Sequence, residues 1–137
     1  MKITFIGAGN MATAIIKSVI SSGKLLAGEI YVYDKLSEKT DSLAELGINK
    51  CDTLKSACDS GDCIVLAVKP QDYSELLCDI KNITKDLDKK TFISIAAAIS
   101  CSNALVNFPF FGVFSLTASP NPFKIVSTRR YSAIFWP

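Results

Sequence analysis

The chain has 137 residues, of which 49% are hydrophobic and 20% are charged, and it contains no histidine. This length and composition allow a core to form and exclude intrinsic disorder. The lack of histidine excludes catalytic triads, Cys–His pairs and imidazole acid–base chemistry. The net charge of +2 does not favour a nucleic-acid partner.

The cysteines and the N-terminal residues indicate in which cellular compartment the protein works. The five cysteines are odd in number and include no C-x-x-C pair. We interpret them as reduced thiols of a cytoplasmic protein rather than as disulfides or metal ligands. The opening residues MKITFIGAGN fit neither a signal peptide nor a membrane span. These features predict a cytoplasmic protein without a membrane partner.

Strand patterns and helical patterns alternate over the first hundred residues. Strands are predicted at residues 2–7, 29–34, 48–51, 63–68 and 92–97, and helices at 10–22, 37–46, 53–60 and 72–87. Met11 is one of the apolar positions of the first helix, Ser37 is expected to N-cap the second, and Leu46 to face inward. The alternation predicts an α/β fold: a Rossmann-type doubly wound parallel sheet of order 3-2-1-4-5, forming a single domain with an irregular C-terminal tail.

The turn after the first predicted strand has the pattern G-x-G-x-x-A. Its residues are Gly7, Ala8, Gly9, Asn10, Met11 and Ala12. Gly7 permits the tight turn, Gly9 lets a pyrophosphate approach the backbone, and the small Ala12 lets the helix pack close to the sheet. Free N–H groups at the start of that helix attract anions. In this position the pattern predicts dinucleotide binding.

Asp34 ends the second predicted strand, 22 residues after Ala12. A carboxylate there accepts hydrogen bonds from the ribose hydroxyls of adenosine and repels a 2′-phosphate, which favours NADH over NADPH. Alternatively, Asp34 is an ordinary solvent-facing acid at the end of a strand. Lys35 and Lys39 either partly accommodate a 2′-phosphate or belong to a solvated helix start.

The segment Ala67-Val68-Lys69-Pro70 closes the fourth predicted strand. In an open α/β sheet, ligands bind beyond the carboxyl ends of the strands, where the strand order reverses. This segment is therefore expected to flank the glycine turn. Lys69 either balances pyrophosphate charge there or is an ordinary loop lysine.

Three motifs follow one another over about residues 1–100. They are Phe5-Ile6-Gly7-Ala8-Gly9-Asn10-Met11-Ala12 with Ala14-Ile15, Leu66-Ala67-Val68-Lys69-Pro70, and Ser94-Ile95-Ala96-Ala97-Ala98. In sequence and order they resemble the N-terminal domain of the pyrroline-5-carboxylate reductase family. We interpret residues 1–100 as a dinucleotide-binding domain of this kind.

The resemblance implies NAD(P)H-dependent reduction of 1-pyrroline-5-carboxylate to L-proline. Hydride adds to the C=N carbon, and an imine protonated by solvent needs no histidine. The catalytic residue is left unassigned, and no metal is expected. The implied cofactor contacts are Gly7, Ala8, Gly9, Asn10, Met11, Ala12, Asp34, Lys35, Ala67, Val68, Lys69, Pro70 and Ala97. Two alternatives are a non-catalytic dinucleotide-binding module and another NAD(P)-dependent imine or ketone reductase.

The composition changes near residue 100. Residues 1–90 contain all 13 acidic residues and no arginine, whereas residues 101–137 contain no acid and both arginines. The family's M-P-N-T-P segment has only a faint counterpart, and Ala98 replaces its usual glycine. The family's helical C-terminal domain, through which it dimerises and binds substrate, is absent, so this chain alone is not expected to turn over substrate.

Residues 101–137 form an atypical tail with three possible origins. A frameshift or premature stop would change the composition abruptly. A diverged ending could still pack on the sheet. The third interpretation is a membrane-binding or partner-binding segment, although its apolar run is too short to span a bilayer.

Overall fold

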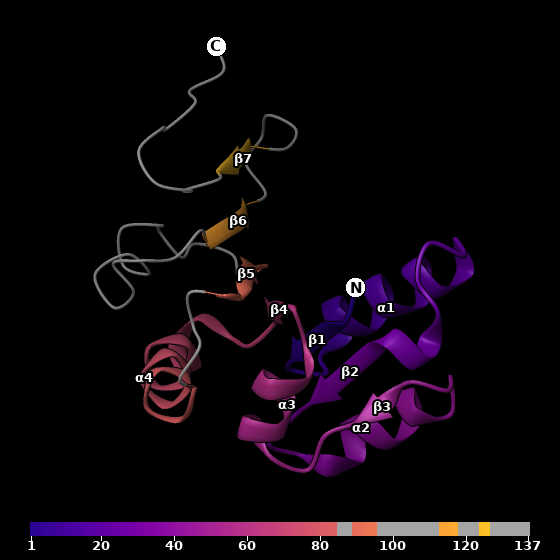
Figure 1. The fold of residues 1–137 in the computed structure, drawn as a ribbon, viewed down its shortest axis with the longest axis horizontal. Helices are drawn as coiled ribbons and strands as arrows, with labels where there is room; N and C mark the ends of the chain where they lie inside the picture. The colour runs from indigo at the N-terminus through magenta and orange to yellow at the C-terminus, as the bar shows by residue number, and fades with distance from the viewer. Residues whose placement is uncertain (85–88, 96–112, 118–123, 127–137) are drawn as a thin grey trace.

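One sheet runs through the part of the chain that the structure describes. In this computed structural model that part comprises residues 1–84, 89–95, 113–117 and 124–126. The strand order is β3-β2-β1-β4-β5-β6-β7, and every neighbouring pair is parallel except β6 and β7 (Figure 1). The predicted doubly wound order of the first five strands is confirmed.

The elements follow the predicted alternation. The strands are β1 Ile3–Ile6, β2 Ile30–Tyr33, β3 Asn49–Lys50, β4 Cys63–Leu66, β5 Thr91–Ser94, β6 Val113–Thr117 and β7 Lys124–Val126. The helices are α1 Asn10–Ser21, α2 Ser37–Ala44, α3 Leu54–Ser60 and α4 Tyr73–Ile83, with short 3₁₀ helices η1 Ala27–Glu29 and η2 Pro70–Asp72. The first four strands are each shorter than their predicted ranges, and β5 begins one residue before its predicted range. Residues 96 and 97 of that predicted strand lie outside the described part of the chain.

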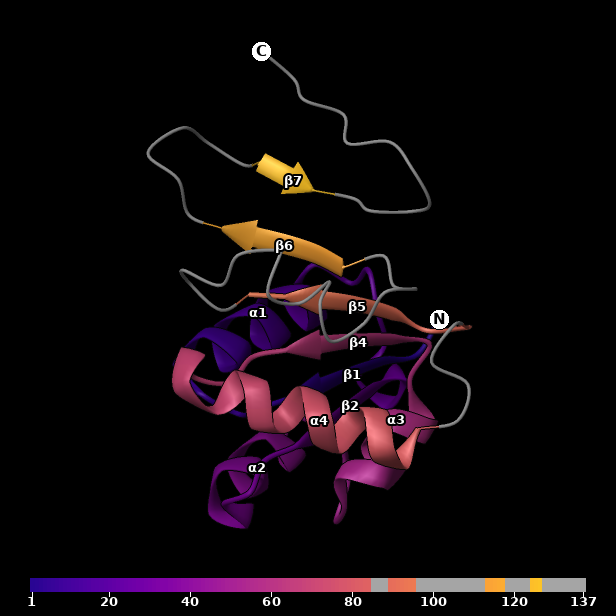
Figure 2. The same ribbon diagram turned by 90° about the vertical axis from the view of Figure 1, so that its left-hand side faces the viewer.

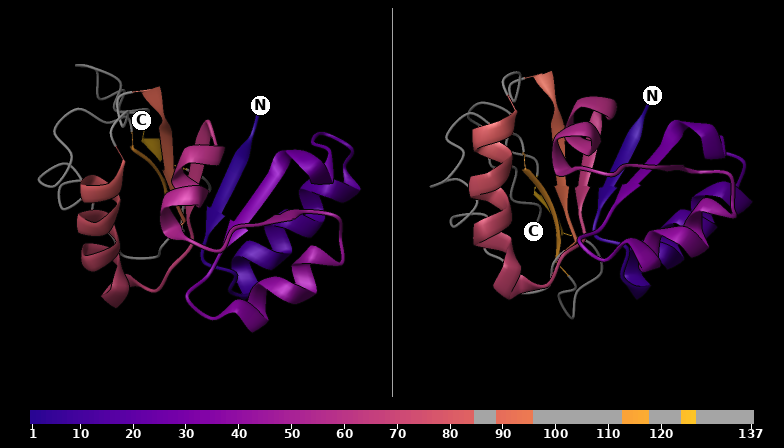
Figure 3. Two further views of the ribbon diagram at one scale, coloured as in Figure 1. Left: turned by 60° about the horizontal axis from the view of Figure 1, so that its bottom comes forward. Right: turned by 90° about the horizontal axis from the view of Figure 1, so that it is seen from below.

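Alternate residues of the central strands pack into two separate cores. Phe5 and Val65 belong to the core under α1 and α2, whereas Ile6 and Leu66 belong to the core under α3 and α4. The turned views show helices on both faces of the sheet (Figures 2 and 3). All four residues of β4 are buried. Burial on both faces explains why the sequence of this strand is continuously apolar.

Three predictions about helices α1 and α2 are wrong in detail. The N-cap of α2 is Leu36 rather than Ser37, because the Asp34 carboxylate accepts the Leu36 N–H at 2.9 Å and forms the turn before the helix. Helix α2 ends at Ala44, and Leu46 is 36% exposed instead of facing inward. Met11, at the start of α1, is 63% exposed and does not join the apolar face of that helix.

The predicted tail contributes two strands to the sheet. Strand β6 pairs parallel with β5, and β7 pairs antiparallel with β6 at the edge (Figure 2). These two strands are absent from the sequence-based assignment. The remaining tail residues lie outside the described part of the chain, as do Ala97 and Ala98, so the origin of the tail stays an open prediction.

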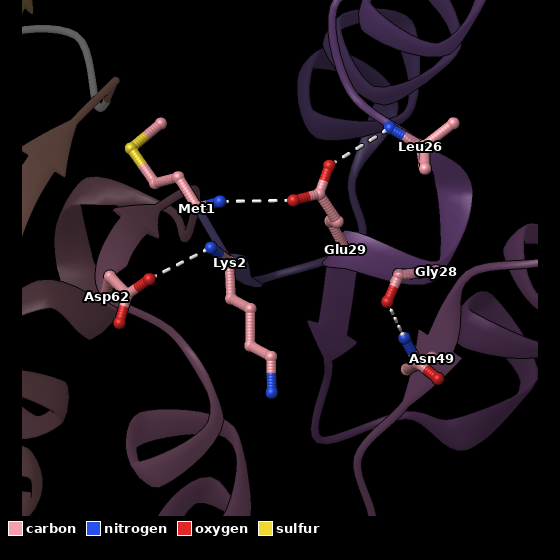
Figure 4. A network of polar contacts seen from close by, with 7 residues as sticks. All are labelled: Met1, Lys2, Leu26, Gly28, Glu29, Asn49 and Asp62. Atoms are coloured by element: carbon pink, nitrogen blue, oxygen red, sulfur yellow. Dashed lines mark hydrogen bonds and ion pairs between the residues drawn. The ribbon is translucent and has the colours of Figure 1, made fainter.

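Polar contacts join the amino ends of the strands (Figure 4). The amino group of Met1 lies 3.0 Å from Glu29 Oε1, and Glu29 Oε2 accepts the Leu26 N–H at 3.3 Å. The Lys2 N–H donates to Asp62 Oδ2 at 3.0 Å. These contacts tie β1 to the segments that precede β2 and β4, at the edge of the sheet opposite to the glycine turn.

The described cysteines are buried thiols except one. Cys51, Cys58 and Cys63 are buried and Cys78 is exposed, and none of these four forms a disulfide. Burial raises the pKa of the three buried thiols, which keeps them protonated and unreactive. Within the described ranges, no helix is long and apolar enough to cross a membrane, and no cluster of three or more potential ligands could hold a metal ion.

Candidate functional site

The glycine turn lies where the carboxyl ends of β1, β2 and β4 meet. Gly7 directly follows β1 and has a φ of +103°, a left-handed conformation that favours glycine. Its N–H donates to the Tyr33 carbonyl oxygen at 2.8 Å. A Cβ added to Gly7 would lie 2.5 Å from the Ala67 carbonyl oxygen. The turn therefore packs directly against the segment that follows β4.

Helix α1 begins immediately after this turn. Its N-cap is Gly9, and no side chain accepts a hydrogen bond from the first turn of the helix there. The first N–H groups of a helix have no partner within the helix itself. A Cβ added to Gly9 would meet no atom within 4 Å, whereas Ala12 is fully buried against the sheet. The start of α1 thus presents backbone donors next to open space.

Asp34 follows β2 and connects it to the glycine turn. Its Oδ2 accepts the Ala8 N–H at 2.8 Å, and its Oδ1 accepts the Leu36 N–H at 2.9 Å. Two backbone donors therefore hold the half-buried carboxylate in one orientation. Each carboxylate oxygen has a further lone pair that can accept another hydrogen bond.

Lys35 forms an ion pair with a helix on the other side of the site. Its Nζ lies 3.2 Å from Glu75 Oε1, in the first turn of α4, and both side chains are about two-thirds exposed, at 67% and 68%. Glu75 raises the pKa of Lys35 above its ordinary value, and the charges of Asp72 and Asp79 add to this effect. Glu75 is not among the site residues predicted from the sequence. Its position in the first turn of the helix after the fourth strand is the signal that could have identified it.

The segment after β4 runs along the same edge of the sheet. The Ala67 N–H donates to the Ile6 carbonyl oxygen at 2.8 Å, which fixes this segment beside β1. Lys69 and Pro70 are exposed, and the Lys69 carbonyl oxygen accepts the Asp72 N–H at 3.0 Å where η2 begins. Lys39 is also exposed, on α2.

The structure brings most of the predicted contacts to one edge. The arrowheads of β1, β4 and β5 point to the same edge of the sheet, and α4 begins there (Figure 2). The glycine turn, Asp34 and residues 67–70 all lie at this edge. Asn10 and Met11 are exposed in the first turn of α1, whereas Ala8 is buried. Ala97 lies outside the described residues.

These residues fit a dinucleotide. The open space at Gly9 and the uncapped start of α1 would receive the pyrophosphate, because backbone donors and the helix dipole both favour an anion. The fixed carboxylate of Asp34 would accept hydrogen bonds from ribose hydroxyls. The glycine turn could not take this conformation with a side chain at Gly7, because a Cβ there would collide with the Ala67 carbonyl oxygen.

A protein-family model matches nearly all of the first hundred residues. Residues 2–98 match the model described as "NADP oxidoreductase coenzyme F420-dependent". The match covers both cores, the glycine turn, Asp34 and the segment after β4, so it includes all of the predicted cofactor contacts.

Comparisons with individual proteins match pyrroline-5-carboxylate reductases and, by structure, also imine reductases. The chain is 38% identical over 101 residues to pyrroline-5-carboxylate reductase of Escherichia coli (strain K12), an alignment that covers 72% of this chain and 36% of that protein. A pyrroline-5-carboxylate reductase structure from Coxiella burnetii superimposes with a TM-score of 0.74 at 26% identity, covering 88% of this chain and 44% of that one. An imine reductase from Myxococcus stipitatus, solved with NADP⁺, gives a TM-score of 0.67 at 26% identity and covers 88% and 42%.

The chain therefore spans little more than a third of the length of the curated relatives it matches. Over its first hundred residues it is homologous to pyrroline-5-carboxylate reductases, which confirms the resemblance found in the sequence.

Proposed function

The chain belongs to the NADP oxidoreductase family whose model is described as coenzyme F420-dependent, and on this basis we propose that residues 1–100 are the dinucleotide-binding domain of a pyrroline-5-carboxylate reductase. The observation that carries the proposal is the uncapped start of α1 beside the open space at Gly9, with the Asp34 carboxylate fixed next to it. The proposed reaction is the NAD(P)H-dependent reduction of 1-pyrroline-5-carboxylate to L-proline.

Each part of the site has a distinct role in this proposal. When bound, the reduced nicotinamide supplies the hydride. The glycine turn and the start of α1 bind the pyrophosphate, Asp34 binds the adenosine ribose, and residues 67–70 line the edge between β1 and β4. These residues orient the cofactor, and such positioning supplies much of the rate enhancement in reactions of this kind. Residues that contact the imine, and those that join two copies of the enzyme, are proposed to lie outside the matched region.

We further propose that the site prefers NADH to NADPH. A 2′-phosphate at the ribose would face the Asp34 carboxylate, and the carboxylate could turn away only by losing its bonds to the Ala8 and Leu36 N–H groups. The adjacent cation, Lys35, is already paired with Glu75.

We propose that the protein works in the cytoplasm, where the unpaired thiols of its described cysteines would remain reduced.

Two titrations test the cofactor assignment. NADH and NADPH are each titrated into the purified chain, and heat or nucleotide fluorescence reports binding. We expect both to bind, with a lower Kd for NADH. A Kd for NADPH at least tenfold lower than that for NADH would reverse the preference, and no binding of either would refute the site.

Turnover assays separate the candidate reactions. Oxidation of NADH when 1-pyrroline-5-carboxylate is added supports the proposed enzyme. Turnover restricted to other cyclic imines would favour a second candidate, an imine reductase, which the likeness to the Myxococcus stipitatus enzyme supports. Nucleotide binding without turnover would fit both the proposed cofactor domain and a third candidate, a non-catalytic binding module, because the residues that contact the imine are proposed to lie outside the matched region.

A further inference from the structure

The ion pair between Lys35 and Glu75 lies next to the residue that contacts ribose in the proposed function. Lys35 directly follows Asp34, the residue proposed to bind the adenosine ribose. Its amine is therefore the cation that lies nearest in sequence to that residue. The structure places this amine 3.2 Å from Glu75 Oε1 on α4, a residue 40 positions later in the chain. The pair spans two elements that both reach the site edge.

Two further carboxylates act on the same lysine. Asp72 ends η2 and is the N-cap of α4, whereas Glu75 and Asp79 lie four residues apart on α4, a spacing that places these two on one side of the helix. All three attract the Lys35 amine, and Glu75 has the largest effect. The negative charge that faces Lys35 therefore comes from this helix, in addition to Asp34 beside it.

We propose that Glu75 is a specificity-determining residue that disfavours NADPH by holding Lys35 and by repelling the 2′-phosphate. To bind NADPH, Lys35 would have to leave Glu75, and the phosphate would approach two carboxylates, Glu75 and Asp34. NADH lacks the phosphate, so its binding does not require Lys35 to move. This inference rests on the proposed function and assigns part of its cofactor preference to α4, outside the glycine turn and the end of β2.

The substitution Glu75→Gln isolates this effect. It removes the negative charge but keeps nearly the same shape and an exposed position, so the fold is not disturbed. We expect the affinity for NADPH to rise about three- to tenfold, the range for one exposed charge pair that becomes a lysine–phosphate contact. The affinity for NADH should change less than twofold. The gain should shrink at high salt, because the charges are exposed and screened.

The test is calorimetric titration of the full chain with NADH and with NADPH, for the wild type and three variants. The first variant is Glu75→Gln, and the second combines Glu75→Gln with Lys35→Ala. The third, Asp59→Asn, is the matched control: it breaks another exposed ion pair, in which Lys55 Nζ lies 2.7 Å from Asp59 on α3. Unfolding temperatures of all variants establish that the fold is intact.

The expected pattern is a gain for NADPH in Glu75→Gln only, lost again when Lys35 is also removed. The inference is overturned if Glu75→Gln leaves NADPH affinity unchanged, improves both nucleotides equally, or keeps its gain without Lys35. A wild-type chain that binds neither nucleotide would refute the proposed function, and the inference would fall with it. Because these results differ, failure of the inference can be distinguished from failure of the proposed function.

Discussion

At the scale of single residues, Gly7 and Asp34 differ in how far the sequence could predict them. The pattern around Gly7 predicted a tight turn, and its φ of +103° is consistent with that prediction. The sequence predicts ribose binding by Asp34, but it does not predict the hydrogen bond that Asp34 accepts from the Ala8 N–H. That bond depends on how closely β2 approaches the turn in the folded chain, which residue spacing does not specify.

Replacing Gly7 tests whether the conformation of the turn requires a glycine. In Gly7→Ala the new Cβ would lie 2.5 Å from the Ala67 carbonyl oxygen, in a backbone conformation that costs a non-glycine residue roughly 1–2 kcal/mol. We expect a loss of at least about 2 kcal/mol in the free energy of unfolding, since the clash adds to that strain. Urea unfolding followed by circular dichroism measures this loss.

Gly28→Ala is the control for this substitution. A Cβ added to Gly28 would meet nothing within 4 Å, and Gly28 is not among the glycines with positive φ. Its free energy of unfolding should change by less than about 0.5 kcal/mol, as at most surface positions. Equal losses in Gly7→Ala and Gly28→Ala would contradict the account of the turn.

At the scale of elements, helices were easier to predict than their ends. The start of α3 follows from Thr53, whose hydroxyl oxygen accepts the Ser56 N–H at 3.1 Å as a local cap should. The start of α2 does not follow from Ser37, because Asp34 provides the turn instead. Exposure of Leu46 follows from the early end of α2. Asp34 and Ser37 both lie in the short connection around the start of α2, so residue type alone does not decide which of them forms the turn.

The N-cap of α3 allows a prediction of how much one capping hydrogen bond stabilises the fold. Thr53→Ala removes the only side-chain acceptor that the structure shows for the first turn of α3, and we expect a loss of about 1 kcal/mol in the free energy of unfolding. Thr53→Ser keeps the hydroxyl and should recover most of that loss. Thermal or urea unfolding of the two variants measures both values. If the serine variant is as unstable as the alanine variant, loss of the capping hydrogen bond is not the cause of the lower free energy of unfolding.

For the whole molecule, the order of the first five strands is predictable from the sequence, whereas the two strands added beside β5 are not. Alternation of strands and helices predicts right-handed crossovers, which lead to the observed order of β1 to β5. Strands β6 and β7 lie in the stretch predicted to be irregular. Short strands of three to five residues depend on the edge they pair with, and that edge exists only in the folded sheet.

The contacts at the amino ends of the strands predict a pH dependence for the whole domain. Hydrogen bonds from the Met1 amino group and the Leu26 N–H lower the pKa of Glu29 below 4.5. A depressed pKa favours the folded state above the ordinary pKa, and this contribution is lost as the pH falls through the folded-state value. Glu29→Gln should therefore be less stable than the wild type at pH 7, with a difference that disappears at pH values well below 4.5.

Unfolding temperatures measured from pH 7 down to pH 3 test this prediction. Glu45→Gln, which removes an exposed carboxylate at the end of α2, serves as the control. A Glu29→Gln difference that stays constant with pH would show that the lost stability does not come from ionisation of this carboxyl group.

Mapping the binding site by NMR tests whether the carboxyl edge of β1, β2 and β4 binds a dinucleotide. Amide chemical shifts of the ¹⁵N-labelled chain are followed while NADH is added. We predict saturable shifts that concentrate at residues 7–12, Asp34 to Leu36 and Ala67 to Lys69, with little change at the amino edge around Lys2 and Asp62. Saturable shifts centred on another face, or no saturable shifts at millimolar NADH, would contradict the account.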